Sequence, residues 1–138
     1  MIELFDTSAL ILAARDPRAG MALTDAVAGD ELAVSEPILL EYLNGARNLA
    51  EYDRFAEGFR GARVVTTDSA DWDRALQIHR LLAASGPGHQ RGVHLPDLII
   101  AAAAERHGLA VVHYDEDFDR IAAVSGQRTR WVLPRGSV

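Results

Sequence analysis

The chain of 138 residues is long enough to bury a sizeable core, and no apolar run approaches the roughly 20 residues that a membrane span requires. It has no cysteine, which excludes disulfides, thiolate nucleophiles and cysteine-based zinc sites, and no signal-peptide pattern, so we expect a cytoplasmic protein without membrane contact. The net charge of −6 argues against a protein that merely coats nucleic acid, although a carboxylate site filled with divalent cations still suits a nuclease.

The first half of the chain alternates short apolar runs with helical patterns. In order, we expect a strand over Ile2–Phe5, helices over Ser8–Arg15 and Ala19–Ala28, a strand over Leu32–Val34, helices over Glu36–Ala46 and Glu51–Phe59, and a strand over Arg63–Thr66. Pro17 forces the break between the first two helices, and Gly29 ends the second of them.

The second half continues this alternation. In order, we expect a helix from Asp68 or Ser69 to Ala84, a glycine-rich loop over Ser85–His94, a helix from Pro96 that stops at Gly108, a strand over Leu109–Tyr114, a helix over Asp117–Val124 and a strand over Thr129–Val132. Strands that alternate with helices predict a parallel sheet covered on both faces, so we expect one three-layer α/β domain over residues 1–138.

Four acidic side chains are expected at one edge of this sheet. Asp6 and Asp115 each follow a predicted strand directly. Asp97 lies in the first turn of the helix that leads into the strand before Asp115, and Glu41 lies inside the helix after the second strand. Because chemistry in a parallel α/β sheet collects beyond the carboxyl ends of the strands, these residues point to a common site.

Each acid also has a purely structural interpretation. Asp6 and Asp115 could cap the helices that follow them, with Asp117 in the first turn, and Asp97 suits the positive end of its helix dipole. Glu41 is harder to explain in this way, because its apolar neighbours in ILLEYL indicate a largely buried helix. A buried carboxylate needs a partner, and the absence of lysine leaves arginine or a metal ion for that role.

Taken together, the acids favour a metal site over four separate caps. Carboxylates within a few ångströms raise one another's pKa values, and a hard cation offsets their repulsion. Oxygen ligands alone suit Mg²⁺ or Mn²⁺. The five histidines show no zinc spacing, so we do not expect a histidine zinc site.

The motifs FDTSAL, EYLNG and LPDLIIAAAAERHGLAVVHYDEDFDRIA, with WV near the end, resemble a PIN-domain ribonuclease of the VapC toxin type. The resemblance covers nearly the whole chain in the same order, and Leu95–Ala122 is its most specific part. It implies a PIN-like three-layer α/β/α fold with a short, mostly parallel sheet. It also implies a Mg²⁺- or Mn²⁺-dependent endoribonuclease, the toxin of a bacterial toxin–antitoxin pair.

The same resemblance implies roles for particular residues and partners. The family's acidic quartet corresponds to Asp6, Glu41, Asp97 and Asp115, with Asp117 as a further candidate metal ligand and Ser8 as the support of the first aspartate. The implied reaction is hydrolysis of RNA, usually tRNA or rRNA, by a metal-activated water. The implied partners are a second copy of the chain, in a homodimer, and a small VapB-like antitoxin that blocks the site.

Four basic side chains are further candidates for contact with RNA. Arg91 and His94 lie in the glycine-rich loop, and Arg15 and Arg47 lie close in sequence to the first two acids. An ordinary mobile connection and solvated helix surface are the alternative interpretations of these residues.

Three other functions compete with the nuclease. A phospho-acceptor domain normally carries a lysine, which this chain lacks, and a haloacid-dehalogenase-type phosphatase carries a second aspartate where Ser8 stands. A non-catalytic PIN-like module that binds RNA or protein is the remaining alternative, and the retained acids argue against it.

Overall fold

The structure is a computed structural model that describes residues 1–138, and its centre is a five-stranded parallel sheet. The strands are β1 (Glu3–Phe5), β2 (Leu32–Ser35), β3 (Arg63–Val65), β4 (Val111–His113) and β5 (Thr129–Trp131). They are paired in the order β3-β2-β1-β4-β5, and Leu4 of β1 lies opposite Ala33 of β2 and Val111 of β4. The predicted parallel α/β sheet is confirmed.

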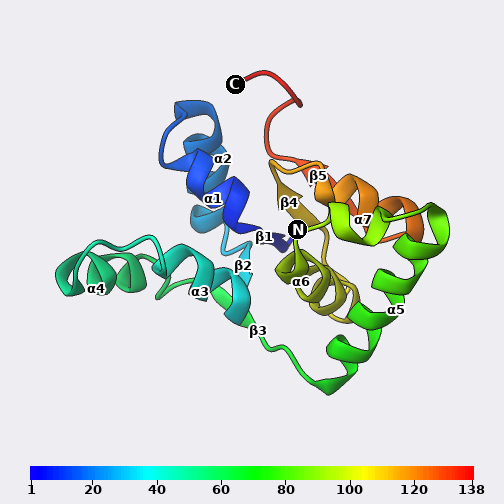
Figure 1. The fold of residues 1–138 in the computed structure, drawn as a ribbon. Helices are drawn as coiled ribbons and strands as arrows, with labels where there is room; N and C mark the ends of the chain where they lie inside the picture. The colour runs from blue at the N-terminus through cyan, green and yellow to red at the C-terminus, as the bar shows by residue number, and fades with distance from the viewer.

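Seven helices flank the sheet (Figure 1). They are α1 (Thr7–Ala13), α2 (Pro17–Ala28), α3 (Glu36–Leu43), α4 (Leu49–Gly58), α5 (Ser69–Ser85), α6 (Leu95–Arg106) and α7 (Asp117–Ser125), and a short 3-10 helix, η1, spans His89–Gly92. Successive strand residues point to opposite faces, and every residue of β2 and β4 is buried. Both faces of the central sheet are therefore covered, as expected of a parallel sheet.

The strand order reverses its direction between β1 and β4. From β1 the chain moves outward to β2 and β3, and it then returns to β4 and β5 on the other side of β1. In open parallel sheets, ligands bind beyond the carboxyl ends of the strands at such a reversal. Asp6 follows β1 directly, and Asp115 lies two residues after β4. The topology alone therefore brings these two acids to the same edge.

The helix α6 has more buried residues than any other helix. Every residue from Asp97 to Ala104 is buried, including the four consecutive alanines Ala101–Ala104. A helix that is apolar on all sides packs against neighbours on all sides, and the small alanines allow close approach. Asp97 in the first turn is the one charged residue of this buried stretch.

The helix α3 is less buried than its apolar sequence indicates, so that expectation was wrong. Only Ile38 is fully buried, and Leu40 is 67% exposed. The helix also ends at Leu43, before Asn44 and Gly45, and not at the predicted Ala46. Apolar composition favours burial but does not supply a neighbour that covers every side of the helix.

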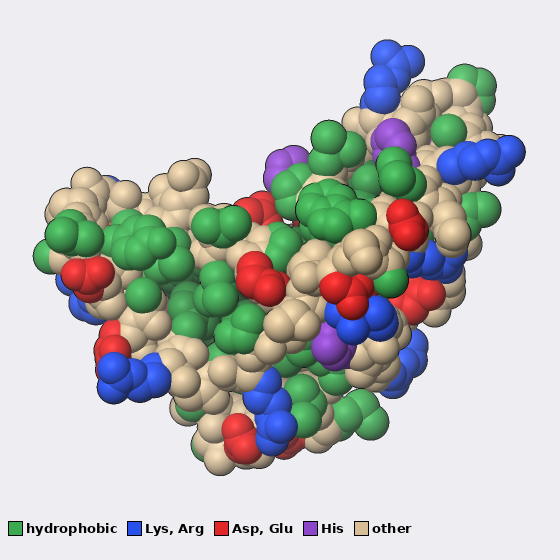
Figure 2. Space-filling view, turned by 90° about the horizontal axis from the view of Figure 1, so that it is seen from below, with side chains coloured by type: hydrophobic (Ala, Val, Ile, Leu, Met, Phe, Trp, Pro, Cys, Tyr) green, Lys and Arg blue, Asp and Glu red, His purple; other side chains and the backbone are tan.

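Large apolar side chains remain exposed on α3, α5 and α6. They include Leu40, Trp72, Leu76 and Leu95, which are 59–69% exposed and, with Pro37 and Ile99, line two adjoining shallow pockets. Figure 2 shows hydrophobic side chains gathered on one face of the molecule, with charged residues both among them and at the edges. No helix combines the length and the apolar character needed to cross a membrane.

An ion pair between a buried carboxylate and a partly exposed arginine joins the beginning of α5 to the end of α6. Asp71 is 1% exposed, and its carboxylate accepts hydrogen bonds from Arg106 Nε at 2.8 Å and Nη2 at 3.0 Å. Burial by itself raises the pKa of Asp71, but the hydrogen bonds from Arg106 and from the backbone N–H of Asp68 outweigh it and lower the pKa overall. Asp71 is therefore a charged group whose burial depends on Arg106.

Replacing Arg106 with alanine should lower the free energy of unfolding by about 3 kcal/mol, because a buried carboxylate loses its cation. Urea unfolding at pH 7 measures the loss. Arg74→Ala is the matched control, since Arg74 joins the same two helices through the partly exposed Glu105 and should cost only about 0.5 kcal/mol. Equal losses in the two variants would contradict the distinction between the buried and the exposed pair.

Candidate functional site

Asp6 caps α1 with one carboxylate oxygen and leaves the other without a partner. Its Oδ2 accepts hydrogen bonds from the backbone N–H of Ser8 at 3.0 Å and from the Ser8 hydroxyl at 2.6 Å. Its Oδ1 is buried and has no hydrogen-bond partner. The Ser8 hydroxyl oxygen also accepts from the backbone N–H of Tyr114 at 2.9 Å, which ties the end of β1 to the end of β4. The capping role of Asp6 is thus compatible with a second role for its free oxygen.

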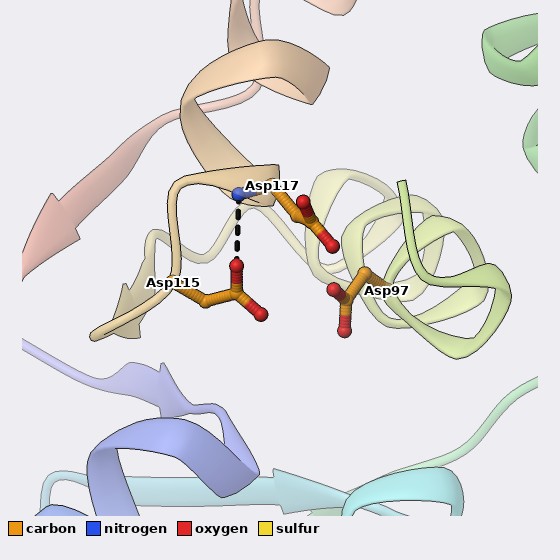
Figure 3. Close-up of side chains that lie close together, drawn as sticks. All are labelled: Asp97, Asp115 and Asp117. Carbon is orange, nitrogen blue, oxygen red and sulfur yellow. Dashed lines mark hydrogen bonds between the residues drawn. The ribbon is translucent and has the colours of Figure 1, made fainter. Parts of the chain in front are cut away.

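Three aspartates from two segments of the chain point towards one another (Figure 3). One carboxylate oxygen each from Asp97, Asp115 and Asp117 lies within 4.8 Å of the other two. Asp115 Oδ1 accepts from the backbone N–H of Asp117 at 2.9 Å, and Asp117 Oδ2 accepts from the backbone N–H of His94 at 2.9 Å. Oxygens this close together can share one hard cation.

Asp97 resists ionisation in this environment. The side chain is 3% exposed, and its Oδ2 is buried without a hydrogen-bond partner. Burial is the largest cause, and the nearby charges of Asp6, Asp115, Asp117 and Glu41 add to it, so that the pKa of Asp97 rises to about 9. The structure therefore brings the other four predicted acids close enough to raise the pKa of Asp97.

Glu41 reaches the same cluster from α3. Its Oε1 accepts a hydrogen bond from the Thr7 hydroxyl at 3.3 Å. Burial, followed by the charge of Asp6, raises the pKa of Glu41, while His94 and the Thr7 hydrogen bond oppose that rise. Burial likewise raises the pKa of Asp6 against the hydrogen bonds from Ser8. Glu41 is half-buried, so it is not enclosed in the core.

Positive charge is scarce around this cluster. Arg120 Nη1 lies 3.0 Å from Asp117 Oδ1, and it belongs to the only arginine that forms an ion pair with any of the five acids. Two buried carboxylate oxygens, Asp6 Oδ1 and Asp97 Oδ2, have no donor at all. An all-oxygen donor set with unpartnered buried oxygens and uncompensated negative charge fits a hard cation such as Mg²⁺ or Mn²⁺.

The four basic candidates are placed differently around the site. His94 and Arg91 are exposed on the loop before α6, and His94 is close enough to influence the pKa of Glu41. Arg15 lines a shallow pocket together with Ser8, the residue that binds Asp6. Arg47 is engaged elsewhere, because its guanidinium forms an ion pair with a carboxylate of α4 at 2.8 Å.

Comparison with known proteins gives the family. The chain matches the PIN domain over residues 4–124. It is 38% identical to ribonuclease VapC18 of Mycobacterium tuberculosis over 138 residues, which cover all of both chains. It is 40% identical to ribonuclease VapC51 of the same organism over 135 residues, 98% of this chain and 96% of that one. This chain belongs to the PIN-domain VapC ribonucleases. The predicted family and the nuclease class of the enzyme are confirmed.

Solved VapBC structures share the fold. VapBC-1 from nontypeable Haemophilus influenzae aligns with a TM-score of 0.75 at 18% identity, covering 96% of this chain and 98% of that chain. The DNA-bound VapBC from Salmonella typhimurium aligns with a TM-score of 0.71 at 23% identity, covering 96% and 100%. At these identities the likeness concerns the fold, and the predicted PIN-like α/β architecture is confirmed.

Two polar contacts of this VapC site were not predicted from the sequence. Thr7 donates to Glu41, and Arg120 pairs with Asp117. The hydroxyl of Thr7, between Asp6 and Ser8, was a usable signal because it follows a strand end directly. Arg120 gave no such signal, since nothing local separates it from the other arginines on helix surfaces.

Without metal, the free energy of unfolding of the wild type should fall as the pH rises from 5 to 8. The pKa of Asp97 is about 9 in the fold against an ordinary value of 3.8, so the folded state binds more protons than the unfolded state over this range. Asp97→Asn removes that contribution and should be more stable than the wild type by about 3 kcal/mol at pH 8, with a smaller gain at pH 5.

Urea unfolding in a chelator at both pH values tests this expectation. Asp73→Asn is the control, because Asp73 is exposed on α5 and should leave both the stability and its pH dependence unchanged. An Asp97→Asn protein that is less stable than the wild type at pH 8 would show that Asp97 serves as a structural cap.

Proposed function

We propose that this VapC ribonuclease is the toxin of a toxin–antitoxin pair and hydrolyses RNA with Mg²⁺ or Mn²⁺ held by its acidic cluster. The observation that carries the proposal is the pair of buried oxygens, Asp6 Oδ1 and Asp97 Oδ2, which have no protein partner within a cluster of like charges. The substrate class that we propose, tRNA or rRNA, rests on the family resemblance. The relatives VapC18 and VapC51, which are both named ribonucleases, support the reaction type.

The proposed ligands are Asp6, Glu41, Asp97 and Asp115, with Asp117 as a fifth acid beside them. When bound, the cation would activate a water for attack on a phosphodiester and stabilise the charge that develops on its oxygens. Ser8 holds one oxygen of Asp6 so that the other faces the cluster. Thr7 similarly orients Glu41, and the backbone N–H of Asp117 orients Asp115.

Loading the site requires a proton to leave. The pKa of Asp97 is about 9 without metal, so this carboxyl is protonated at neutral pH and must ionise before both of its oxygens can act as ligands. The negative charges of the other acids raise the affinity of Asp97 for its proton. They also raise the affinity of the whole cluster for a cation. Around the cluster, the exposed cations Arg91 and Arg15 and the ring of His94 are the proposed contacts to RNA phosphates.

We also propose that the chain assembles with a small VapB-like antitoxin and forms a homodimer. The solved relatives in this fold include proteins described as a toxin–antitoxin complex from Klebsiella pneumoniae and as VapBC from Salmonella typhimurium. The exposed apolar side chains on α3, α5 and α6, which include Leu40, Trp72 and Leu95, are of the kind that protein interfaces cover. They support the expectation that protein partners bind this chain.

Mn²⁺ should raise the melting temperature of the wild type, because a ligand that binds only the folded state adds about 2.7 kcal/mol of stability at a hundred times its Kd. Asp97→Asn should lose most of this response, since one buried ligand oxygen is replaced by a neutral amide. Differential scanning fluorimetry with and without Mn²⁺ measures both effects. The Asp73→Asn control should respond like the wild type, and an unchanged response in Asp97→Asn would remove Asp97 from the metal site.

Cleavage of RNA should require Mg²⁺ or Mn²⁺, stop on addition of chelator and leave 5′-phosphate and 3′-hydroxyl ends. A 2′-deoxy substitution at the cleavage position should not abolish the cut, because water and not the ribose hydroxyl is the proposed nucleophile. Sequencing of RNA ends after brief expression locates that position. Complete dependence on the 2′-hydroxyl would overturn the water mechanism, and RNA binding without any metal-dependent cut would favour the non-catalytic module.

A further inference from the structure

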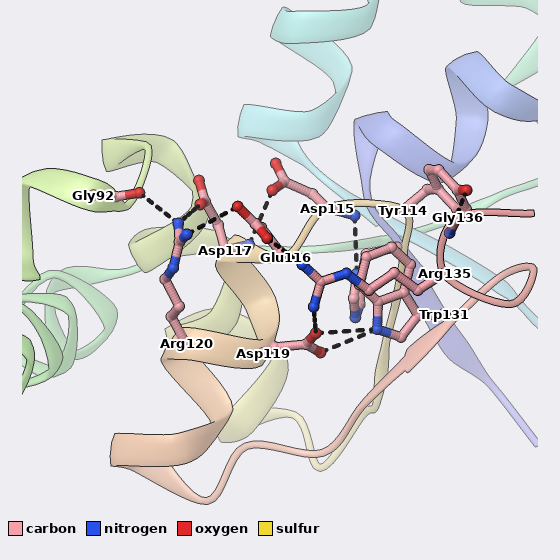
Figure 4. A network of polar contacts seen from close by, with 11 residues as sticks. Gly92, Tyr114, Asp115, Glu116, Asp117, Asp119, Arg120, Trp131, Arg135 and Gly136 are labelled. Carbon is pink, nitrogen blue, oxygen red and sulfur yellow. Dashed lines mark hydrogen bonds and ion pairs between the residues drawn. The ribbon is translucent and has the colours of Figure 1, made fainter. Parts of the chain in front are cut away.

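Arg120 joins three groups that belong to two different parts of the chain (Figure 4). Its Nη1 donates to Asp117 Oδ1 at 3.0 Å and to the backbone carbonyl of Gly92 at 3.0 Å. Its Nη2 donates to Glu116 Oε1 at 2.8 Å. Arg120 therefore links the first turn of α7, next to the acidic cluster, to the loop that precedes α6.

That loop, residues 86–94, is held against α7 at two points. The carbonyl of Gly92 accepts from Arg120, and the backbone N–H of His94 donates to Asp117 Oδ2 at 2.9 Å. Asp117 is thus bound through both of its oxygens, one by the loop and the other by Arg120. The loop contains three glycines, and its other fixed parts are η1 and Val93, which packs into the core. The contacts to Arg120 and Asp117 add to these restraints at the end of the loop next to the acidic cluster.

Arg120 has no substitute in this role. Arg135 also pairs with Glu116, but it lies on the other side of the first turn of α7, over the ring of Trp131 and beside Asp119. No other arginine forms an ion pair with Asp117. The planar guanidinium suits the bridge, because it offers several N–H donors in fixed directions, whereas a lysine offers one compact ammonium.

We propose that Arg120 is a positioning residue for the nuclease, which fixes the loop 86–94 at the rim of the acidic cluster through Gly92 and Asp117. The loop carries Arg91 and His94, so its placement sets where an RNA strand meets the site. The effect on RNA rests on the proposed function. The effect on the loop does not, since the contacts form within the chain itself.

Arg120→Ala should loosen the loop without removing the metal site. Hydrogen exchange of the backbone amides of residues 89–94, measured on the metal-free protein, should accelerate about tenfold, because the carbonyl of Gly92 loses its charged donor and Asp117, which accepts from the N–H of His94, loses the cation that holds it. The KM for RNA should rise roughly tenfold with a smaller change in kcat, as is typical when a group that orients the site is removed. The rise in melting temperature on adding Mn²⁺ should persist, because Asp6, Asp97 and Asp115 remain in place.

Arg120→Lys distinguishes the hydrogen bonds of the guanidinium from the effect of its positive charge. It keeps a cation near Asp117 but cannot reproduce the fork, so the loop should exchange nearly as fast as in Arg120→Ala. Arg74→Ala is the matched control, since it removes an arginine–carboxylate pair at the opposite end of α6 and should leave loop exchange and KM unchanged. The comparison of Arg120→Ala with Arg74→Ala also distinguishes a specific effect on the loop from a general loss of stability.

Three results would overturn the proposal. Unchanged exchange of residues 89–94 in Arg120→Ala would show that the loop is held by other contacts. Full restoration by Arg120→Lys would show that charge alone matters. Loss of the Mn²⁺ response in Arg120→Ala would place Arg120 in support of the metal ligands. If the chain cuts no RNA at all, the proposed function fails, while the exchange measurement still decides the role of Arg120 in placing the loop.

Discussion

Repulsion among partly and fully buried carboxylates dominates the electrostatics of the region beyond the ends of β1 and β4. Five acidic side chains from four segments of the chain meet there, and Arg120 is the single cation paired with any of them. The consequence is clearest at Asp97, whose pKa rises to about 9. The apolar core of the sheet and α6 must offset this local instability, and a bound cation would relieve it directly. The site is thus less stable than the scaffold that holds it.

Hydrogen bonds from the scaffold hold four of the five acids, and Asp97 is the exception. Ser8 binds Asp6 and also the backbone of Tyr114, so the ends of β1 and β4 are fixed together. The Thr7 hydroxyl reaches Glu41 across 34 positions of sequence, and the start of α6 reaches Asp117 across 23. These hydrogen bonds are few and specific, and they orient oxygens that repulsion alone would push apart.

An acidic chain that acts on RNA faces a second electrostatic problem. The net charge of −6 repels a polyanion at long range, so attraction must come from local features. The features proposed for this VapC ribonuclease are Arg91 and His94, which are exposed on a loop that Arg120 contacts. On that proposal, the placement of a few cations matters more than the overall charge of the molecule.

The sequence by itself determined the succession of strands and helices along the chain, the acids at the strand ends and the family. These features depend on local patterns and on the spacing of motifs. Asp6, Asp97 and Asp115 could be predicted as neighbours, since parallel strands end at one edge. Only the tertiary structure decided that α3 is half exposed, that Asp117 is bound through both oxygens and that Arg120 reaches Gly92. Those features depend on which surfaces meet in space, and residues 23 to 34 positions apart in the chain carry no local signal of their contact.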